Sequence, residues 1–326
     1  MILAGDIGGT KTVLALFEPG ARTLTPVREE TYSSRQSATF DAILGRFLDG
    51  SPGVSITSAC FGVAGAVVDG RCSATNLPWK LEERHLTSAI PAQHVKLLND
   101  LEAAAWGVIN LPETELLTLQ AGTPVKGHMV VIAAGTGLGE AVIFWDGQQH
   151  SVMASEGGHC DIAPRNEMED ELVRYLRKKF GGHVSYERVL SGPGFFNIYS
   201  FLRDSGFAPE PDALRAKLKA GDPSATVAEE GLKGTDANCV KTLDLFASLY
   251  GAEAGNLVLK VMAVGGVYIA GGIGPKLKDK LADGTFIQAF WDKGRMSNLL
   301  KNTPVRLALN PKAPLLGAAF VAGRTQ

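Results

Sequence analysis

Short hydrophobic runs separated by glycine-rich turns dominate the first half of the chain. In two places an apolar run is followed by a glycine turn and then by a second apolar run, which predicts two strands joined by a tight turn. These paired strands are expected at residues 2–4 with 12–17, and at 129–134 with 140–145. The two pairs echo each other, which indicates a duplicated α/β architecture.

The same pattern predicts the remaining main elements. Short apolar runs ended by glycine or polar residues predict further strands at 55–63, 95–98, 267–270 and 305–309. Apolar residues spaced three or four apart predict helices at 39–48, from 101 onward, at 240–261 and at 315–322. From about Glu167 the pattern is mostly helical, and a length of 326 residues allows two domains.

Composition and charge narrow the class of protein. Hydrophobic residues make up 45% and charged residues 20%, which is typical of a globular protein, and a net charge of −2 favours neither nucleic acid nor an anionic membrane. The basic run 174–179 is expected to end a helix with an acidic start at 167–171. The most apolar stretch, 257–273, is interrupted by Lys260 and glycines, so no membrane span is expected.

The cysteines and the N-terminus indicate a cytoplasmic location. The four cysteines are scattered without a C-x-x-C pair, which argues against a disulfide framework and a cysteine-rich zinc site. The N-terminus lacks a basic region followed by a sustained apolar run, so no signal peptide is predicted.

The first glycine turn, Gly5-Asp6-Ile7-Gly8-Gly9-Thr10-Lys11-Thr12, differs from a Walker A phosphate loop in two respects. Thr10 rather than glycine precedes the lysine, and an apolar strand rather than a helix follows it. A hairpin turn can still present backbone N–H groups to phosphate. Because Asp6 would repel phosphate directly, it indicates an intervening Mg²⁺, although a plain hairpin turn fits the local pattern equally well.

Two further glycine clusters follow predicted strands. They are Gly135-Thr136-Gly137-Leu138-Gly139 and Ala270-Gly271-Gly272-Ile273. Each alone is as compatible with a bulge or tight packing as with a ligand site. Three phosphate-compatible turns in one chain are far less expected by chance.

The three turns, in this order and spacing, resemble the two phosphate motifs and the adenosine motif of actin-like sugar kinases. The segments GDIGGTK, LLNDLEAAAWG, GTGLGEA, SEGGHCDIAP, YERVLSGPGFFNIY and VYIAGGI together resemble bacterial glucokinases, over residues 2 to about 320. The resemblance implies an actin-like (ribonuclease H-like) two-domain α/β fold. A smaller α/β domain would comprise residues 1–109 and 300–326, a larger α+β domain residues 110–299, with the sugar in the cleft between them.

Asp100 is the candidate proton acceptor for phosphoryl transfer. It follows a predicted strand and opens a predicted helix, where α/β folds place ligands, but Asn and Asp are also preferred N-caps. Asn99 with Glu102 resembles a capping box, so the local pattern leaves both interpretations open. The resemblance implies that Asp100 is the catalytic base. Asn99 would then bind neighbouring sugar hydroxyls or cap the helix.

Glu156, His159 and Glu187 are the other implied sugar-binding residues. Carboxylates and imidazole share hydroxyl hydrogens in fixed directions, and such charge-assisted bonds are strong. For His159 the alternatives are a surface histidine or the zinc ligand found in related ROK proteins, although only Cys160 is close and no C-x-C-G follows. For Glu187 the alternative is a carboxylate favoured by the N-terminus of a helix.

The resemblance also implies a nucleotide site, with ATP and Mg²⁺ as cofactors. Lys11 after Thr10 is typical of ROK proteins, whereas similar glucokinases often have Asn there, so this lysine either neutralises phosphate charge or faces solvent. The implied nucleotide-binding residues, among which Asp6 faces Mg²⁺ through water, are Gly5, Asp6, Gly8, Gly9, Thr10, Lys11, Gly135, Thr136, Gly137, Gly271 and Gly272.

The expected activity is the MgATP-dependent phosphorylation of D-glucose at its 6-hydroxyl, the entry step of glycolysis, in a cytoplasmic homodimer. One alternative is a kinase for another hexose or an N-acetylated amino sugar. The other is a non-catalytic sugar-sensing regulator. The regulator is disfavoured for two reasons. The first glycine turn starts by residue 8, so no room is expected before it for a DNA-binding domain, and Asp6 and Asp100 are both present.

Overall fold

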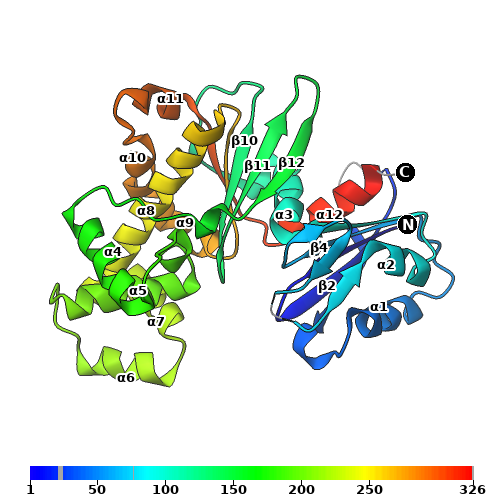
Figure 1. Ribbon diagram of the computed structural model, residues 1–326, viewed down its shortest axis with the longest axis horizontal. Coiled ribbons are helices and arrows are strands. Elements are labelled where there is room, and N and C mark those ends of the chain that lie inside the picture. The colour runs from blue at the N-terminus through cyan, green and yellow to red at the C-terminus, as the bar shows by residue number, and fades with distance from the viewer. Residues whose placement is uncertain (21–24, 76, 325–326) are drawn as a thin grey trace. The chain divides into compact units, whose positions relative to one another are not determined.

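The structure is a computed structural model that describes residues 1–20, 25–75 and 77–324, and the chain divides into two compact units (Figure 1). Unit 1 comprises Met1–Glu113, Val152–Ala154 and Asn310–Gln326. Unit 2 comprises Thr114–Ser151 and Ser155–Leu309.

Unit 1 is built on a five-stranded sheet of order β3-β2-β1-β4-β8. Strand β1 pairs antiparallel with β2 and parallel with β4, and a three-stranded sheet β5-β6-β7 lies elsewhere in the unit. The strands are β1 (Ile2–Ile7), β2 (Lys11–Phe17), β3 (Pro26–Ser33), β4 (Ser58–Val63), β5 (Val67–Val68), β6 (Arg71–Ser73), β7 (Lys80–Glu82) and β8 (His94–Asn99).

Alternate residues of β1 and β2 pack on opposite faces of this sheet. Leu3 and Leu14 belong to one buried cluster, whereas Ile2 and Val13 belong to another. A strand covered on both faces has no polar side to show, which is why these segments are nearly continuous apolar runs.

Helix α3 (Asp100–Val108) and helix α12 (Ala313–Arg324) lie side by side against the strands of unit 1 (Figure 1). Their close approach requires glycine. A Cβ on Gly107 would overlap the carbonyl of Ala313, and one on Gly317 would overlap the carbonyl of Ala103. This packing fixes α3, and with it the side chains at its N-terminus. The other helices of the unit are α1 (Phe40–Asp49) and α2 (Glu83–Ala89).

Unit 2 contains a six-stranded sheet whose first five strands repeat the arrangement of unit 1. Its order is β12-β11-β10-β13-β14-β9, in which β10 pairs antiparallel with β11 and parallel with β13. The predicted duplication is therefore present in the sheet topology. The strands are β9 (Leu116–Gln120), β10 (Met129–Ala134), β11 (Leu138–Trp145), β12 (His150–Ser155), β13 (Gly266–Ala270) and β14 (Val305–Ala308).

Helices form the rest of unit 2, as expected from about residue 167 onward. The long buried helix α8 is attached to the sheet through Tyr250, whose hydroxyl donates to the carbonyl of Ile132 (3.0 Å) and accepts from the N–H of Ala134 (3.2 Å). The helices are α4 (Glu167–Phe180), α5 (Gly192–Asp204), α6 (Asp212–Ala220), α7 (Pro223–Lys233), α8 (Ala237–Val261), α9 (Lys278–Ala282), α10 (Thr285–Trp291) and α11 (Ser297–Asn302).

The compact units differ from the expected domain boundaries at the C-terminus. The expected smaller domain includes residues 300–309, whereas β14 is hydrogen-bonded between β13 and β9 in the sheet of unit 2. Only α12 and the residues beside it return to unit 1, which also takes Val152–Ala154 from β12.

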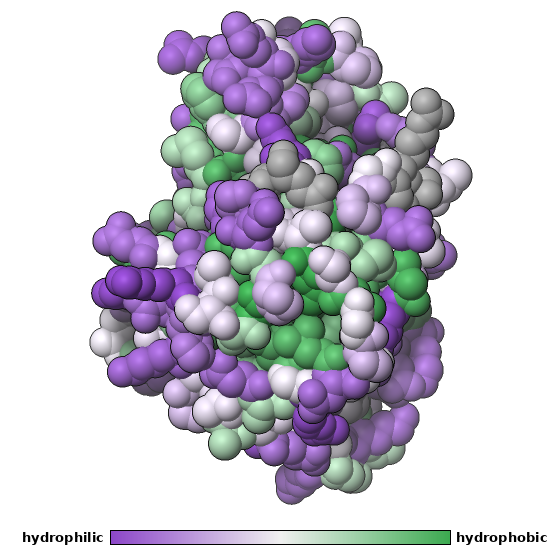
Figure 2. Space-filling view, turned by 90° about the vertical axis from the view of Figure 1, so that its right-hand side faces the viewer, coloured by the Kyte–Doolittle hydropathy of each residue, from purple (hydrophilic) through white to green (hydrophobic). Residues whose placement is uncertain are grey.

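Within the described residues, no helix is long and apolar enough to cross a membrane. Figure 2 shows a surface on which hydrophobic residues form an area bordered by hydrophilic ones. More than half of a typical folded protein's surface is contributed by apolar atoms, so this area by itself assigns no partner.

Candidate active site

The glycine turn of unit 1 is a β-hairpin, which confirms that it is not a Walker A loop. Ile7 pairs with Thr12 across the hairpin, and the N–H of Gly8 donates to the carbonyl of Lys11 (3.0 Å). Ser34 braces the turn from outside, because its hydroxyl donates to the carbonyl of Gly8 (2.7 Å) and its N–H donates to the carbonyl of Thr10 (3.0 Å). A strand, β2, leaves this turn.

Asp6 lies at the carboxyl end of β1, between Val13 of β2 and Gly62 of β4. Burial raises the pKa of its carboxyl, and the positive charge of Lys11 opposes that rise. A partly buried single carboxylate fits a cation such as Mg²⁺, which keeps several water ligands and is held with substrate phosphates. No cluster of three or more His, Cys, Asp or Glu side chains in the described segments could hold a metal ion.

Gly5, also expected at the nucleotide, lies inside β1, where a Cβ would come within 2.6 Å of the Phe61 ring and 2.8 Å of Leu14. Core packing therefore accounts for the glycine at this position. The glycines of the turn itself are placed differently, since Gly8 meets only the Lys11 carbonyl, at 3.1 Å.

Asn99 and Asp100 occupy the junction between β8 and α3. Asn99 is the N-cap of α3: its Oδ1 accepts from the N–H of Leu101 (2.9 Å), while its Nδ2 donates to the carbonyl of Gly65 (3.0 Å). Asp100 is the first residue of the helix, and its Oδ1 also accepts from the N–H of Leu101 (2.9 Å). The capping interpretation thus holds for Asn99, and the cap fixes the position of Asp100 at the end of a sheet strand.

Three segments of unit 2 meet at the second glycine turn. The N–H of Gly192, at the start of α5, donates to the carbonyl of Gly135 (2.8 Å), and the N–H of Ile273 donates to that of Ala134 (3.2 Å). Gly271 has φ +84°, and a Cβ there would overlap the Ala134 backbone. The structure therefore brings Gly135–Gly139, Gly271–Gly272 and the N-terminus of α5 together.

The expected sugar-binding side chains also converge in unit 2. Cys160–Ile162 and Val184–Tyr186 are joined by backbone hydrogen bonds from Ile162 to Val184 (3.0 Å) and from Tyr186 to Cys160 (3.1 Å). This short bridge holds two motifs together that lie about 30 residues apart in the sequence.

Around the bridge, His159 lies between two carboxylates. Its Nε2 is 4.0 Å from Oε2 of Glu156, and its Nδ1 is 4.0 Å from Oε1 of Glu187. Because these separations exceed a hydrogen bond, the three groups converge without being bonded to one another. Glu156 and His159 are mostly exposed, whereas the Glu187 side chain is 29% exposed.

Glu187 also connects this cluster to the glycine turn. Its Oε2 accepts from the N–H of Leu138 (3.1 Å), and a Cβ on Gly137 would overlap the same oxygen. Glycine at 137 therefore leaves space for the carboxylate of Glu187, a role that its sequence motif did not indicate.

Glu140 is a second feature that sequence analysis missed. It is a 1% exposed carboxyl within β11 and faces the segment that carries Glu156 and His159. A signal was present, because Glu140 is the single charged residue in the apolar run 138–145.

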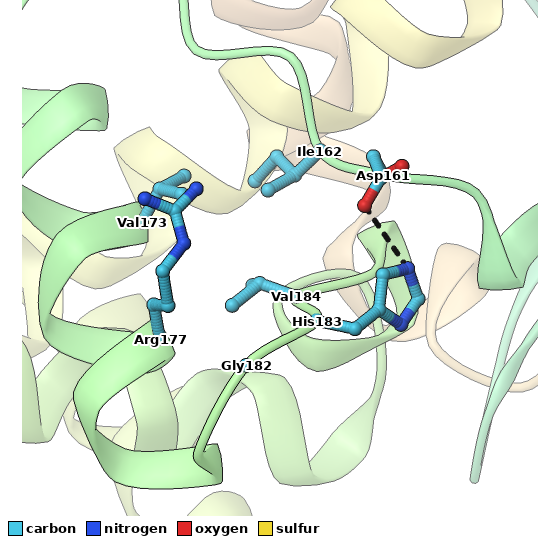
Figure 3. A pocket seen from close by; sticks show the side chains of 7 residues that line it. All are labelled: Asp161, Ile162, Val173, Arg177, Gly182, His183 and Val184. Atoms are coloured by element: carbon cyan, nitrogen blue, oxygen red, sulfur yellow. Dashed lines mark ion pairs between the residues drawn. The ribbon is translucent and has the colours of Figure 1, made fainter.

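A pocket in unit 2 lies between α4 and the segments 161–162 and 182–184 (Figure 3). At its rim, His183 Nε2 lies 3.1 Å from Asp161 Oδ1. No predicted site residue lines it, so it is separate from the candidate active site. The lining residues are Asp161, Ile162, Val173, Arg177, Gly182, His183 and Val184.

The repeated strand order and the glycine hairpins define the class as an actin-like sugar kinase, and solved structures support it. The crystal structure of glucokinase from an Antarctic psychrotroph is 29% identical, covers 99% of this chain and 98% of its own, and has a TM-score of 0.86. A ROK family glucokinase from Streptomyces griseus, in complex with glucose and AMPPNP, shares the fold at 22% identity and a TM-score of 0.65, covering 100% of this chain and 99% of its own.

The particular family follows from sequence. The Glucokinase family model matches residues 3–325. The glucokinase of Synechocystis sp. is 41% identical over 99% of this chain and 98% of that protein. The chain belongs to the glucokinase family, as its motifs predict, and is a hexose kinase.

Proposed function

We propose that this member of the glucokinase family transfers the γ-phosphoryl group of MgATP to the 6-hydroxyl of D-glucose. The observation that carries the proposal is the convergence of Glu156, His159 and Glu187 in unit 2, with Glu187 bonded to the glycine turn at Leu138. Two carboxylates and an imidazole around one point suit a polyhydroxylated substrate, because each binds hydroxyl groups in a fixed direction.

In this proposal Glu156, His159 and Glu187 bind the sugar hydroxyls. Glu187 is the most restricted of the three, since one oxygen is held by Leu138 and the other faces His159. It therefore orients the ring, while the more exposed Glu156 and His159 complete the contacts.

The glycine turns bind the nucleotide. We assign Gly8, Gly9, Thr10 and Lys11 of unit 1, and Gly135, Thr136, Gly137, Gly271 and Gly272 of unit 2, to ATP. A Cβ on Gly135 or on Gly272 would meet nothing within 4 Å, so there is room beside both backbones for a ligand. Asp6 would hold Mg²⁺ through water. Bound there, Mg²⁺ supplies positive charge that neutralises the phosphate oxygens.

Asp100 accepts the proton of the sugar hydroxyl. As the hydroxyl oxygen bonds to the γ-phosphorus, its proton passes to the carboxylate of Asp100, and the phosphorus–oxygen bond to ADP breaks with its electrons remaining on ADP. The Asn99 cap supports this role because it fixes the start of α3. Positioning of this kind provides most of the catalysis in phosphoryl transfer.

A coupled assay of ADP release tests the function directly. Hexoses and N-acetylated amino sugars are compared as acceptors, and ATP, ADP and polyphosphate as donors. We expect the highest kcat/KM with glucose and ATP, and no turnover without a divalent cation. A higher kcat/KM for mannose, fructose or an amino sugar would overturn the glucose assignment, and no ADP release with any sugar would overturn the kinase.

We also propose that the protein is a cytoplasmic homodimer. Light scattering of the purified chain is expected to give twice the monomer mass of 34.5 kDa. A monomer mass at micromolar concentration would refute the dimer.

A further inference from the structure

Glu140 is a buried carboxyl with an unsatisfied oxygen. It is 1% exposed, and its Oε1 has no hydrogen-bond partner among the described residues. Burying an ionised carboxylate without partners is very costly, and such a group usually takes up a proton instead. Neither the nucleotide nor the sugar contacts proposed above use this residue.

The other oxygen of Glu140 lies against the backbone of the sugar-binding segment. A Cβ on Gly157 would overlap Oε2 of Glu140 and would be 3.2 Å from Oγ of Ser155. Ser155 ties the same segment to β11, because its hydroxyl donates to the Glu140 carbonyl (3.0 Å) and accepts from the N–H of Gly157 (3.1 Å). Gly157 is flanked by Glu156 and lies two residues before His159, so Glu140 lies directly behind the sugar-binding side chains.

The charges that face Glu140 come from α8. The carboxylate of Glu253, which is fully buried, raises the pKa of Glu140, and the ammonium of Lys260 lowers it. Tyr250 contributes a hydroxyl that bonds to the backbone of β10. Lys260, the cation that favours an ionised Glu140, is already engaged, because its Nζ donates to Oε1 of Glu253 (3.0 Å).

Glu253 has its own complete set of partners. Asn256 Nδ2 donates to its Oε2 (2.8 Å) and also to the hydroxyl of Tyr186 (3.1 Å), while Lys293 Nζ donates to Asn256 Oδ1 (2.7 Å). Both carboxylate oxygens of Glu253 therefore accept a hydrogen bond, one from Lys260 and one from Asn256. A second negative charge on Glu140 would have no comparable partner.

We propose that Glu140 is a positioning residue that supports the sugar-binding segment Ser155–His159 as a neutral carboxylic acid, and that its ionisation weakens glucose binding. The inference deepens the proposed function and rests on its assignment of Glu156 and His159 to the sugar. A charged Glu140 would attract water. Because the contact between Glu140 and Gly157 leaves no space for a water molecule, Gly157 would be displaced.

The direction of the pH effect follows from burial and from Glu253, which raise the pKa of Glu140 to about 7. Below that pH the carboxyl is neutral and the segment is supported. Above it the carboxyl loses its proton, so glucose affinity is expected to fall as pH rises through the neutral range.

Glu140→Gln separates this effect from other titrations. Glutamine keeps the size of a neutral carboxyl but cannot ionise. Glucose binding, measured by calorimetry without nucleotide, and KM are compared between pH 6 and 9 in wild type, Glu140→Gln, Glu140→Ala and the exposed control Glu171→Gln.

We expect affinity in the wild type and in Glu171→Gln to fall about tenfold, the loss of one hydrogen bond, across this range. Glu140→Gln should stay flat at the low-pH value, whereas Glu140→Ala should bind weakly throughout. A pH dependence that persists in Glu140→Gln would belong to another group, since histidine ordinarily titrates in the same range, and would overturn the inference. A flat wild-type profile would also overturn it.

The contact with Gly157 gives an independent test by a double-mutant cycle. Gly157→Ala should raise the KM for glucose strongly, because its Cβ would overlap the Glu140 carboxyl. In Glu140→Ala/Gly157→Ala the obstruction is gone, so KM should fall below that of Gly157→Ala alone. Additive effects would overturn the contact.

Failure of the sugar assignment itself has a different signature. It is an unchanged KM for glucose in Glu187→Gln, whatever the behaviour of Glu140. The two outcomes are therefore distinguishable.

Discussion

The two glycine hairpins have the same topology but differ in the source of the carboxylate beside the turn. Strands β1 and β2 enclose Gly8–Thr10, and strands β10 and β11 enclose Gly135–Gly137, each beside a parallel strand. The first hairpin carries its own carboxylate at Asp6, one residue before the end of β1. At the corresponding place in β10 stands Ala133, and the second hairpin instead receives the carboxylate of Glu187 on the N–H of Leu138.

In the proposed function, this difference allows the two hairpins to serve two different ligands. A carboxylate built into the strand attracts a cation, and the cation in turn attracts phosphate. A carboxylate delivered from another segment, and fixed by a backbone N–H, presents its second oxygen to a neutral hydroxylated ligand.

The largest effect is expected from Asp100→Asn in unit 1. Removing a general base lowers kcat by about 10²–10⁴-fold, while glucose binding should persist because Glu156, His159 and Glu187 still hold the sugar and Asn retains a polar group at position 100. Steady-state kinetics and calorimetry with glucose measure the two quantities. A kcat close to wild type would exclude Asp100 as the proton acceptor.

Asp6→Asn tests the charged hairpin. The apparent affinity for Mg²⁺ should fall about 10–100-fold, the usual loss for a residue that supports a metal through water, with the KM for glucose unchanged. The measurement is a Mg²⁺ titration of activity at saturating ATP and glucose.

Asp6 also gives a prediction for the pH profile. Because burial raises the pKa of Asp6, wild-type activity should decline in acid at a higher pH than it would with an ordinary aspartate. That decline should disappear in the variant if Asp6 is responsible.

Gly137→Ala tests the hairpin that receives its carboxylate. The new Cβ would displace Oε2 of Glu187, so the KM for glucose should rise about 10–100-fold, the loss of a charged hydrogen bond. Gly45→Ala in α1 is the matched control, because a Cβ there meets nothing within 4 Å. Because Gly137 is also assigned to ATP, a rise in the KM for ATP is compatible with this prediction, but a change in the KM for ATP alone would show that Gly137 makes no space for Glu187.

The sequence predicted most closely the strands that are buried on both faces, and several exposed or very short strands were missed. Strands β1, β2, β10 and β13 are apolar runs, and each was expected within a few residues of its observed bounds. Strand β12 is mostly exposed and β5 has two residues, so neither leaves a hydrophobic pattern that could be recognised.

The site divides in a similar way. Motifs identified Glu156, His159 and Glu187 as a group, and the structure brings these three together. The bond from Leu138 to Glu187 could not be predicted, because it joins segments about 50 residues apart through a backbone group that is the same for every residue type. The burial of Glu140 likewise depends on α8, more than 100 residues further along the chain.

The smallest effect is expected from Ser34→Ala, which removes the brace of the first hairpin. The variant leaves the buried Thr12 hydroxyl and the Gly8 carbonyl each without one hydrogen bond, which should lower the free energy of unfolding by about 1–3 kcal/mol. Because the hairpin's backbone positions are proposed to bind phosphate, the KM for ATP should rise by about two- to fivefold. This is a small loss of binding free energy, since a tenfold change corresponds to about 1.4 kcal/mol. The KM for glucose should not change.

The control is Ser88→Ala, at an exposed helix position, which should alter the unfolding free energy by less than about 0.5 kcal/mol and leave both KM values unchanged. Urea unfolding and steady-state kinetics separate the two consequences. A loss of stability with an unchanged KM for ATP would mean that the first hairpin tolerates a looser turn, and that its charge at Asp6 matters more than its shape.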